Sequence, residues 1–539
     1  SKYTAFPNTT YVLPLTEQKL GHFVMSANTT EAVNLNTITV DYVTGDDTNL
    51  TNLFVKFGPA GSLQTTAAKA TVSTTSSGDV TSQGNDFSVN YTMPIGQSLH
   101  IEVYGNVSSA ETETIVRVNA QATGVTASSA TTVYGTGSAA SARIEGQTIT
   151  YGAGTFTVAK DGTSPSDALV AGNQTATNAK FKFTAQNENF TLTEFFVKLA
   201  SGASAAVDSA ILKDGTTVLA TKPFGTNTDN DSNSVTDSVH FTGLSVAVPA
   251  NSSKVLTVDL DLADVSANFG TTGLALQLTV DEMKFLSSAG TETTDTTPGI
   301  GGTNPAGNTQ IVFKGYPYIT ADNAGLSGTF TNGSTTELYK WKVKATGSNV
   351  AVKQFKFAVS FTDVNTQDLK VDQFTLFKGS TNITADVTIR EDEGNSIEST
   401  THAVSDVASA TESIFISWDD DKEDVIGVGK EVTYTLKGVP AGFNSVSGSK
   451  DSVAFTLIAD NEESAGVVRK FIARDATLNT LELGATVGLT TGDVSDLIWS
   501  DVSSTAHDPD ETAAGSGSGD WHDGYLVEQL NLASKAWSL

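Results

Sequence analysis

One phrase of sequence occurs three times in this chain and restricts its fold more than any other feature. The copies are "MPIGQSLHIEVYGNV" (93–107), "VPANSSKVLTVDLDL" (248–262) and "IGVGKEVTYTLKGV" (426–439). Each copy has a Pro- or Gly-marked turn, followed by a stretch in which apolar and polar residues alternate. Alternation of this kind places successive side chains on opposite faces of a β-strand. The phrase therefore predicts a rim turn that leads into a core strand.

Further elements recur around the phrase in the same order. Strands are expected to open at Phe23, Phe181 and Trp341, with a second strand of each hairpin starting at Val33, Phe190 and Val350. Other alternating stretches begin near Phe87, Phe241 and Phe415, and again near 114, 274 and 452. One such match would be weak, but an ordered series found three times predicts tandem domains of the same fold.

The composition indicates which fold is repeated. The chain contains 78 Thr, 53 Ser and 47 Gly, and only 17% of its residues are charged. Thr and Val suit the half-buried face of a strand, whereas Gly, Asn, Asp and Ser suit turns. No long helical periodicity stands out. We therefore predict an all-β protein with three tandem immunoglobulin-like antiparallel β-sandwich domains and a short C-terminal tail region.

Segments rich in Ser, Thr, Gly and Ala suggest where these domains end. The predicted boundaries are 1–125 (first sandwich), 126–150 (linker), 151–286 (second sandwich), 287–310 (linker), 311–465 (third sandwich) and 466–539 (C-terminal Trp-containing region). Three of the five Trp lie in the last segment. We expect these Trp to fold back on the third sandwich; the alternative is that they dock onto a partner.

Charge and cysteine content exclude several classes of function. The formal net charge of -29 disfavours binding to nucleic acid or to anionic membrane surfaces. The chain has no Cys, so it has neither disulfides nor thiolate chemistry. No apolar run is long enough for a transmembrane helix, and no signal peptide opens the chain, which leads us to expect that Ser1 starts a processed form.

Two acidic loops are candidate calcium sites. Asp419, Asp420, Asp421, Glu423 and Asp424 place five carboxylates within six residues, and Asp229, Asp231 and Asn233 stand at alternate positions in a second loop. Clustered carboxylates repel one another, and a hard divalent cation offsets that repulsion. Calcium is therefore the cofactor that the sequence suggests. The alternative is that both loops are solvated charge runs.

The sequence offers little support for catalysis, and we predict that the chain is not an enzyme. The "GSGSG" run at 515–519 matches the pattern of a nucleophile elbow, but it lies in low-complexity sequence. No two His have the spacing of a zinc-binding helix. His507 and His522 are the pair with the best prospect of sharing a site in the tail.

The C-terminal segments "DLIWSDVSS" (496–504) and "DWHDGYLVEQL" (520–530) carry a resemblance to a known group of proteins. Their pairing resembles the C-terminal signature of large surface proteins from small candidate-phylum (Patescibacteria-type) bacteria. Those proteins carry tandem immunoglobulin-like domains that resemble residues 239–262, and they are S-layer-like or filament-forming. Trp521-His522-Asp523-Gly524 departs slightly from the usual pattern, and the resemblance implies no catalytic residues.

Three functions agree with these observations. The first is a secreted cell-surface protein that assembles with other copies of itself into an S-layer-like lattice. The second is a subunit of an extracellular filament or pilus-like polymer that exchanges strands, with 9–17 and 524–532 as candidate donors. The third is a surface adhesin for glycan or host protein, with a pocket on one domain only. A glycan or cell-envelope anchor is compatible with all three.

Overall fold

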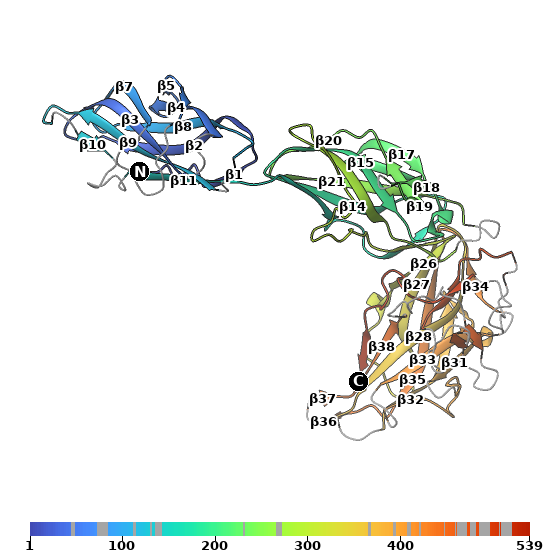
Figure 1. Ribbon diagram of the computed structural model, residues 1–539. Helices are drawn as coiled ribbons and strands as arrows, with labels where there is room; N and C mark the ends of the chain where they lie inside the picture. Colours follow the sequence, from blue (N-terminus) through green and yellow to red (C-terminus); the bar gives the residue numbers. More distant parts are fainter. Residues whose placement is uncertain are drawn as a thin grey trace.

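The computed structural model describes the chain in three successive units, each built from packed β-sheets (Figure 1). It describes residues 1–539 except 28, 45–48, 73–84, 112–114, 130–131, 135–142, 230–231, 266–271, 365–367, 392–394, 407–410, 420–421, 447, 459, 461–471, 475–480, 484–495, 506 and 508–519. Apart from three short 3-10 turns, η3 (Ala203–Ala206), η4 (Asn323–Gly325) and η5 (Thr384–Asp386), every regular element in the described part is a strand. The all-β fold class is confirmed.

The first unit pairs two sheets. One sheet has the order β2 (Leu15–Ser26), β8 (Ser98–Val107), β4 (Leu50–Gly58) and β5 (Gln64–Thr65), with β6 (Lys69–Thr71) also beside β4. The other has the order β1 (Thr9–Tyr11), β11 (Ile144–Tyr151), β9 (Ile115–Val125), β3 (Val33–Thr44) and β7 (Asn85–Met93), with β10 (Thr132–Tyr134) beside β9.

The second unit repeats this plan with an extra short sheet. Its first sheet has the order β12 (Thr155–Lys160), β14 (Thr175–Gln186), β21 (Ser252–Leu262), β16 (Val207–Asp214) and β17 (Thr217–Pro223). The facing sheet has the order β18 (Gly225–Thr228), β19 (Ser234–Phe241), β15 (Phe190–Lys198), β23 (Thr279–Ser287) and β24 (Glu292–Asp295), with β20 (Val246–Val248) beside β15. The short sheet has the order β13 (Ala168–Ala171), β25 (Gln310–Phe313) and β22 (Leu274–Leu276).

The third unit is the largest. Its first sheet has the order β26 (Tyr316–Ala321), β27 (Thr336–Thr346), β35 (Glu431–Ala441), β29 (Lys370–Lys378) and β30 (Thr381–Asn382), with β32 (Val404–Ser405) beside β29. Its second has the order β31 (Val387–Glu391), β33 (Thr411–Trp418), β28 (Val350–Thr362), β38 (Ser452–Ile458) and β43 (Lys535–Ser538), joined by β34 (Asp424–Ile426), β41 (Ile498–Ser500) and β42 (Trp521–His522). Two small hairpins, β36 (Ser445–Val446) with β37 (Ser449–Lys450) and β39 (Ile472–Arg474) with β40 (Leu481–Leu483), complete the list.

The repeated phrase forms the same turn in every unit. Gly96, Asn251 and Gly429 have φ angles of 71°, 56° and 69° at matching positions. In each turn the residue that follows donates a backbone hydrogen bond to the carbonyl three positions earlier, as Lys430 does to Gly427 at 2.9 Å. Only Gly, and less readily Asn or Asp, adopts the left-handed conformation at low cost. That requirement explains why the phrase recurs, and its predicted rim turn is confirmed.

The central strands β3, β15 and β28 share a second feature, a bulge at one position. The pairing register slips between Leu35 and Thr37, between Leu192 and Glu194, and between Val352 and Gln354. These positions lie two to four residues after the first apolar residue of each strand. A bulge at the same position in all three units is a regular feature of this fold. It allows the neighbouring strands of the three units to be aligned residue by residue.

Both predicted linkers prove to hold strands. Residues 126–150 contain β10 and most of β11, which pair with β9, and 287–310 contain β24, which pairs with β23. Their Ser-, Thr- and Gly-rich composition concealed these short strands. The edge strand β24 buries no side chain, whereas β11 lies between β1 and β9 and buries Ile149 and Tyr151. The real connections are shorter: 152–154 joins the first two units, and 314–315 joins the second to the third.

The predicted boundary at 465 is also wrong. It falls between β38 and β41, which together occupy one position in the sheet, beside β28. In the second unit β23 runs unbroken beside β15, pairing Leu286 with Thr191 and Val280 with Val197. In the third unit β38 pairs with only part of β28, and β41 takes the remaining positions, where Ser500 pairs with Ala351. Residues 459–497 are therefore an insertion into the third sandwich, between two halves of one strand.

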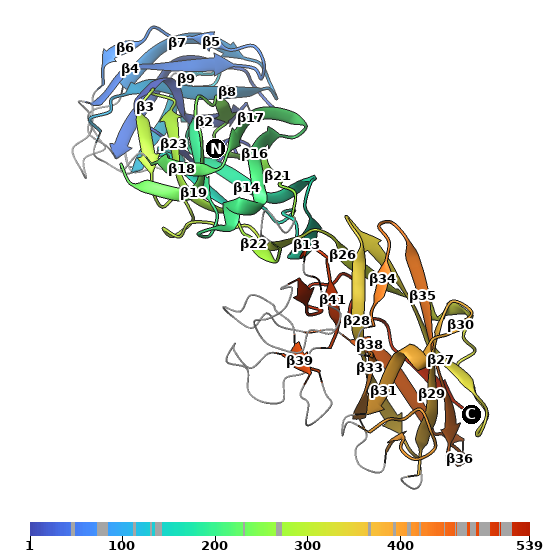
Figure 2. The same cartoon turned by 90° about the vertical axis from the view of Figure 1, so that its right-hand side faces the viewer.

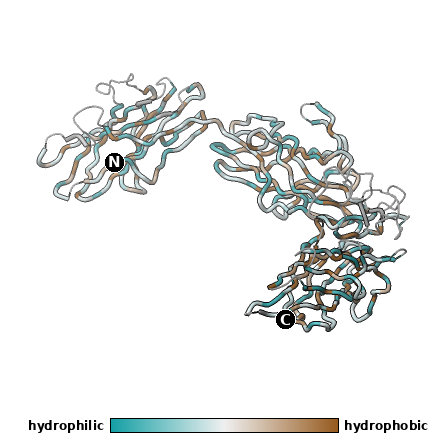
Figure 3. Tube along the Cα trace, turned by 90° about the horizontal axis from the view of Figure 1, so that it is seen from below, coloured by the Kyte–Doolittle hydropathy of each residue, from teal (hydrophilic) through white to brown (hydrophobic). Residues whose placement is uncertain are grey.

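The C-terminal segment completes the third unit. Strand β43 pairs with β38, and Ser538 forms a parallel bridge with Thr329, much as β11 pairs in parallel with β1. Trp537 is 2% exposed, and its Nε1 donates to the Leu338 carbonyl at 2.8 Å. The expectation that the tail folds back on the third sandwich is confirmed for its described residues. Hydrophobic and hydrophilic residues alternate along the strands of each unit (Figure 3), and the hydrophobic ones supply its buried core.

Exchange of a single glycine in the repeated turn tests this account. Replacing Gly429 by Ala should destabilise the third unit by about 1 kcal/mol, since Ala resists its left-handed backbone. Gly427→Ala is the matched control, because an added Cβ would make only an ordinary contact, 3.6 Å from Lys430 Cγ. All five Trp lie in the third unit, so urea unfolding followed by Trp fluorescence reports on it selectively. Equal losses in both variants would contradict the account.

Candidate functional site at the junction of the second and third units

The second and third units share a hydrophobic core where they meet. Leu169 and Phe313 belong to the second unit's short sheet, yet both are buried within the core of the third unit. The Phe313 ring lies 4.9 Å from the Trp499 ring and 4.5 Å from that of His522. In Figure 2, β41 and β13 are both labelled near the connection between the second and third units, and Leu169 of β13 and Trp499 of β41 belong to one core. The strands β41 and β42, which follow the insertion, thus hold the two units together.

A buried carboxylate connects the same elements by hydrogen bonds. Asp501, which follows β41, is fully buried, and its Oδ2 accepts from Thr272 Oγ1 at 2.6 Å and from the Lys314 backbone N–H at 2.9 Å. His522 Nε2 lies 3.8 Å from Oδ1. Burial acts to raise the pKa of Asp501, but its hydrogen bonds and the nearby His522 outweigh burial and lower that pKa. The carboxylate therefore stays ionised while it joins the two units.

A second polar cluster surrounds His507. Its Nε2 lies 2.8 Å from Glu423 Oε2, its Nδ1 lies 3.1 Å from Asp520 Oδ2, and its ring packs 5.1 Å from that of Trp521. Burial acts to lower the pKa of His507, but the two carboxylates outweigh burial and raise it to about 10. A protonated imidazole here ties the segment between β41 and β42 to the acidic loop at 419–424.

The described residues of that acidic loop point to separate partners. Asp419 accepts from Thr388 at 2.6 Å, and Glu423 contacts His507. Asp424 accepts from Lys378 and from the Tyr434 hydroxyl. Asp420 and Asp421 lie outside the described residues. The structure thus directs the three described carboxylates away from a common centre.

The other acidic loop is a tight turn between β18 and β19. Asp229 Oδ1 accepts from the Asn233 backbone N–H at 2.6 Å and Oδ2 from its side chain at 3.2 Å, whereas Asp231 lies outside the described residues. Across the described part of the chain, no three His, Asp or Glu side chains gather closely enough to hold a metal ion. Calcium binding in the two predicted loops stays a prediction.

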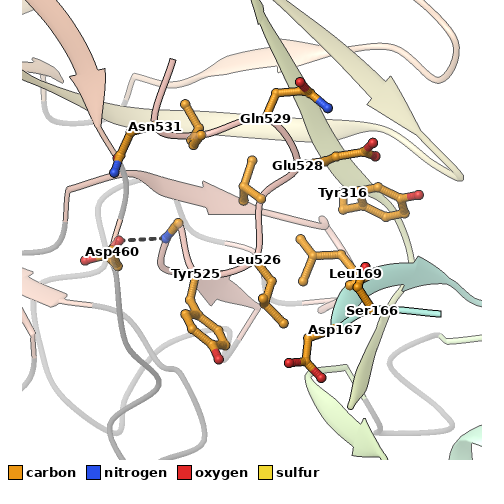
Figure 4. Close-up of a pocket in the computed structure, with 14 residues that line it drawn as sticks. Ser166, Asp167, Leu169, Tyr316, Asp460, Tyr525, Leu526, Glu528, Gln529 and Asn531 are labelled. Carbon is orange, nitrogen blue, oxygen red and sulfur yellow. Dashed lines mark hydrogen bonds between the residues drawn. The ribbon is translucent and has the colours of Figure 1, made fainter. Parts of the chain in front are cut away.

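An open pocket of about 470 Å³ lies beside the junction (Figure 4). Its walls come from 166–169 of the second unit, from Tyr316, and from Asp460 and 524–531 of the third. Asp460 accepts from the Gly524 N–H at 2.8 Å, and burial, with help from Asp523 and Asp496, raises its pKa to about 6. Of these lining residues only Asp460 lies in the insertion, and 524–531 belong to the C-terminal segment between β42 and β43.

Sequence reasoning missed Asp501 and the junction, and it paired the two tail His incorrectly. His507 and His522 belong to different clusters, one around Glu423 and Asp520 and the other around Asp501. The usable signal was the "IWSD" stretch (498–501), since Ile498 and Trp499 are as buried as the core strands that they extend. If 498–500 had been predicted as a strand, Asp501 would have been expected at the end of that strand.

Comparison with known proteins gives similarity to solved structures alone. No protein-family model matches the chain, and no curated protein does. The full-length major pilin SpaD from Corynebacterium diphtheriae is 11% identical, with 87% of this chain and 92% of that one covered at a TM-score of 0.17. The C-terminal domain of the Streptococcus pyogenes antigen I/II-family protein AspA is 11% identical, with 57% and 94% covered at a TM-score of 0.16.

A third similar structure is the B domain of a biofilm associated protein, 10% identical, with 56% of this chain and 81% of that one covered at a TM-score of 0.16. Similarities this low carry no argument about function. The resemblance to surface proteins of candidate-phylum bacteria stays a prediction. Within the described residues, no helix has the length and apolar character that crossing a membrane would require.

The cluster around His507 predicts a dependence of stability on pH. A folded-state pKa of about 10, above the ordinary 6.5, means that the stabilisation is complete below pH 6.5 and is lost as the pH rises toward 10. We expect the free energy of unfolding to fall by about 3 kcal/mol over that interval. His507→Gln should remove most of this dependence, whereas the same change at exposed His402 should keep it. Trp fluorescence during urea unfolding at pH 6.5, 8 and 10 would measure it, and parallel curves for both variants would contradict the assignment.

Proposed function

We propose that this chain is an extracellular structural protein that assembles with copies of itself into a cell-surface layer resembling an S-layer. The observation that supports the proposal best is the junction between the second and third units. Leu169 and Phe313 enter the next unit's core, and Asp501 accepts hydrogen bonds across the boundary. A fused junction transmits force and fixes geometry, which a subunit of a regular lattice requires.

The connection between the first two units is short as well. Only 152–154 separate β11 from β12, Gly152 donates to the Tyr11 carbonyl at 3.0 Å, and Asn187 donates to the Ala153 carbonyl at 3.3 Å. A side chain at Gly154 would meet Glu188 and Phe190 at less than 3.0 Å. The extended arrangement in Figure 1 is thus held by close packing at both connections.

A filament built by strand exchange is an alternative form of assembly. In the single chain, residues 9–17 supply β1 and the start of β2 within the first unit. Residues 524–532 bury Val527 and Leu532 in the core of the third. Exchange would require one of these segments to leave its own unit, so we place the lattice first.

The adhesive alternative is favoured by one specific observation. An adhesin was expected to carry a pocket on one unit only, and the pocket in Figure 4 is lined mostly by residues 524–531 of the third unit, with 166–169 of the second unit on its other side. Tyr316 and Tyr525 line it together with Asp460. Aromatic rings beside carboxylates suit sugar or a cationic side chain, so a glycan or host-protein ligand is our second candidate.

Electron microscopy of the purified protein separates these functions. With millimolar Ca²⁺ we expect ordered sheets, and with a chelator we expect a loss of order if cations bridge the copies. Filaments instead of sheets would favour the strand-exchange form. Single, dispersed particles at high protein concentration in both conditions would overturn the structural proposal and place the adhesive function first.

A further inference from the structure

The first unit carries a buried cluster of titratable side chains on the outer face of one sheet. On β2, Phe23 belongs to the core, so its neighbour His22 points to the opposite face of the sheet. Ile101 of β8 likewise places His100 and Glu102 on that face. An outer face is ordinarily in contact with water, yet His22 is 5% exposed and Glu102 is 8% exposed. A further part of the chain must therefore cover this cluster.

The cover is the segment 1–8, which lies against the outer face of β2 and β8. The Tyr3 ring packs 4.2 Å from that of His22 and 5.1 Å from that of His100. The Tyr3 N–H donates to the His22 carbonyl at 2.8 Å. Gln147 of β11 donates to the carbonyls of Tyr3 and His22 at 3.0 and 3.1 Å. Opening of this segment would return His22 to water.

The two imidazole rings of the cluster share one hydrogen bond. His22 Nε2 lies 2.9 Å from His100 Nδ1. One of these nitrogens must donate the hydrogen and the other must accept it, so the two rings cannot both be protonated at this distance. The contact therefore holds only while at least one ring is neutral.

The nearby carboxylate is already engaged by other groups. Glu102 Oε1 accepts from Lys19 Nζ at 2.6 Å, and Oε2 accepts from the Tyr104 hydroxyl at 2.7 Å. His22 Nδ1 lies farther away, 3.5 Å from Oε1. Burial lowers the pKa of His22 to about 4. The Glu102 carboxylate opposes this shift, whereas Lys19 and His100 add to it. His22 is therefore neutral at pH 7 and resists protonation while it is covered.

The other two units carry a different side chain at this place. The strand register puts Lys180 of β14 and Lys340 of β27 at the position that His22 has on β2. Neither of these Lys is buried. The sandwich itself thus has no need of a buried imidazole here, and the covered His22 is a special feature of the first unit.

We propose that His22, bonded to His100, is an acid-sensitive latch that holds residues 1–8 on the outer face of β2 and β8 when it is neutral and releases them when it is protonated. Because the Val24 N–H donates to the Ser1 carbonyl at 2.8 Å, release also uncovers the outer edge of β2. An uncovered edge can pair with a strand of another chain. The latch does not depend on the proposed self-assembly.

The direction of the pH dependence follows from His22. Its pKa of about 4 in the folded protein is below the ordinary 6.5, so the latch is complete above pH 6.5 and weakens as the pH falls toward 4. The ratio of open to closed segment should therefore rise on the order of a hundredfold between pH 7.5 and pH 4.5.

Hydrogen exchange of the full chain, measured by mass spectrometry in the presence of a metal chelator, tests this expectation. Labelling times are scaled to the intrinsic exchange rate at each pH, so that only structural opening is compared. In the wild type, the protection of peptides from residues 1–8 should fall on the order of a hundredfold between pH 7.5 and pH 4.5. Peptides from β4 and β9 of the same unit should change little.

The decisive variant is His22→Gln, because an amide side chain can keep a hydrogen bond but takes up no proton in this range. Its segment 1–8 should show the same protection at both pH values. His402→Gln is the matched control, because His402 is exposed in the third unit, and it should keep the full fall. His22→Leu, which places an apolar side chain under the Tyr3 ring, serves as a second variant with the same expected pattern, should His22→Gln not fold.

Three results would overturn the latch. A full fall in both His22 variants would mean that acid acts on another group. A wild type without any fall would mean that protonation of His22 does not release the segment. An equal fall in the peptides of β4 and β9 would mean that the whole first unit opens in acid. None of these results bears on lattice formation, which microscopy measures separately.

Discussion

The pairing of β41 with β28 is the interaction on which the rest of the structure depends. It returns the chain to the third sandwich after the insertion, at the positions that β23 occupies beside β15 in the second unit. It buries Trp499 against Phe313, and it delivers Asp501 to the boundary between the units. One short strand thus completes a sheet and joins two units.

Much of the fold could be predicted from the sequence because its repeated features are local. The rim turn needs a left-handed residue, and Gly96, Asn251 and Gly429 satisfy that need within one short stretch each. The alternation of apolar and polar residues likewise follows from side chains that point to opposite faces of a strand. It predicts that Leu256, Val258 and Leu260 share the core face, and all three are buried. Features set within about ten residues can be read directly from one chain.

The rest depended on pairing between distant residues. Strand β24 buries no side chain, and the buried Ile149 and Tyr151 of β11 follow a Ser-, Thr- and Gly-rich stretch, so composition alone made both strands resemble linkers. The sequence did not show that β38 and β41 belong together, because an insertion separates them. Only their pairing with the same strand, β28, shows that they share one position in the sheet. Asp501 was missed for the same reason: its partners Thr272 and Lys314 lie more than 180 residues away. The acidic loops drew attention by their density of charge, although their described carboxylates bind separate partners.

Differential scanning calorimetry tests most directly the claim that β41 and Asp501 fuse the second and third units. In the wild type the account predicts two transitions, one for the first unit and one shared by the other two. Asp501→Ala should split the shared transition, because it removes the acceptor that Thr272 and Lys314 use, whereas Asp322→Ala on the surface should not. A wild-type protein whose second and third units melt separately, or an Asp501→Ala variant that melts like the wild type, would contradict the claim.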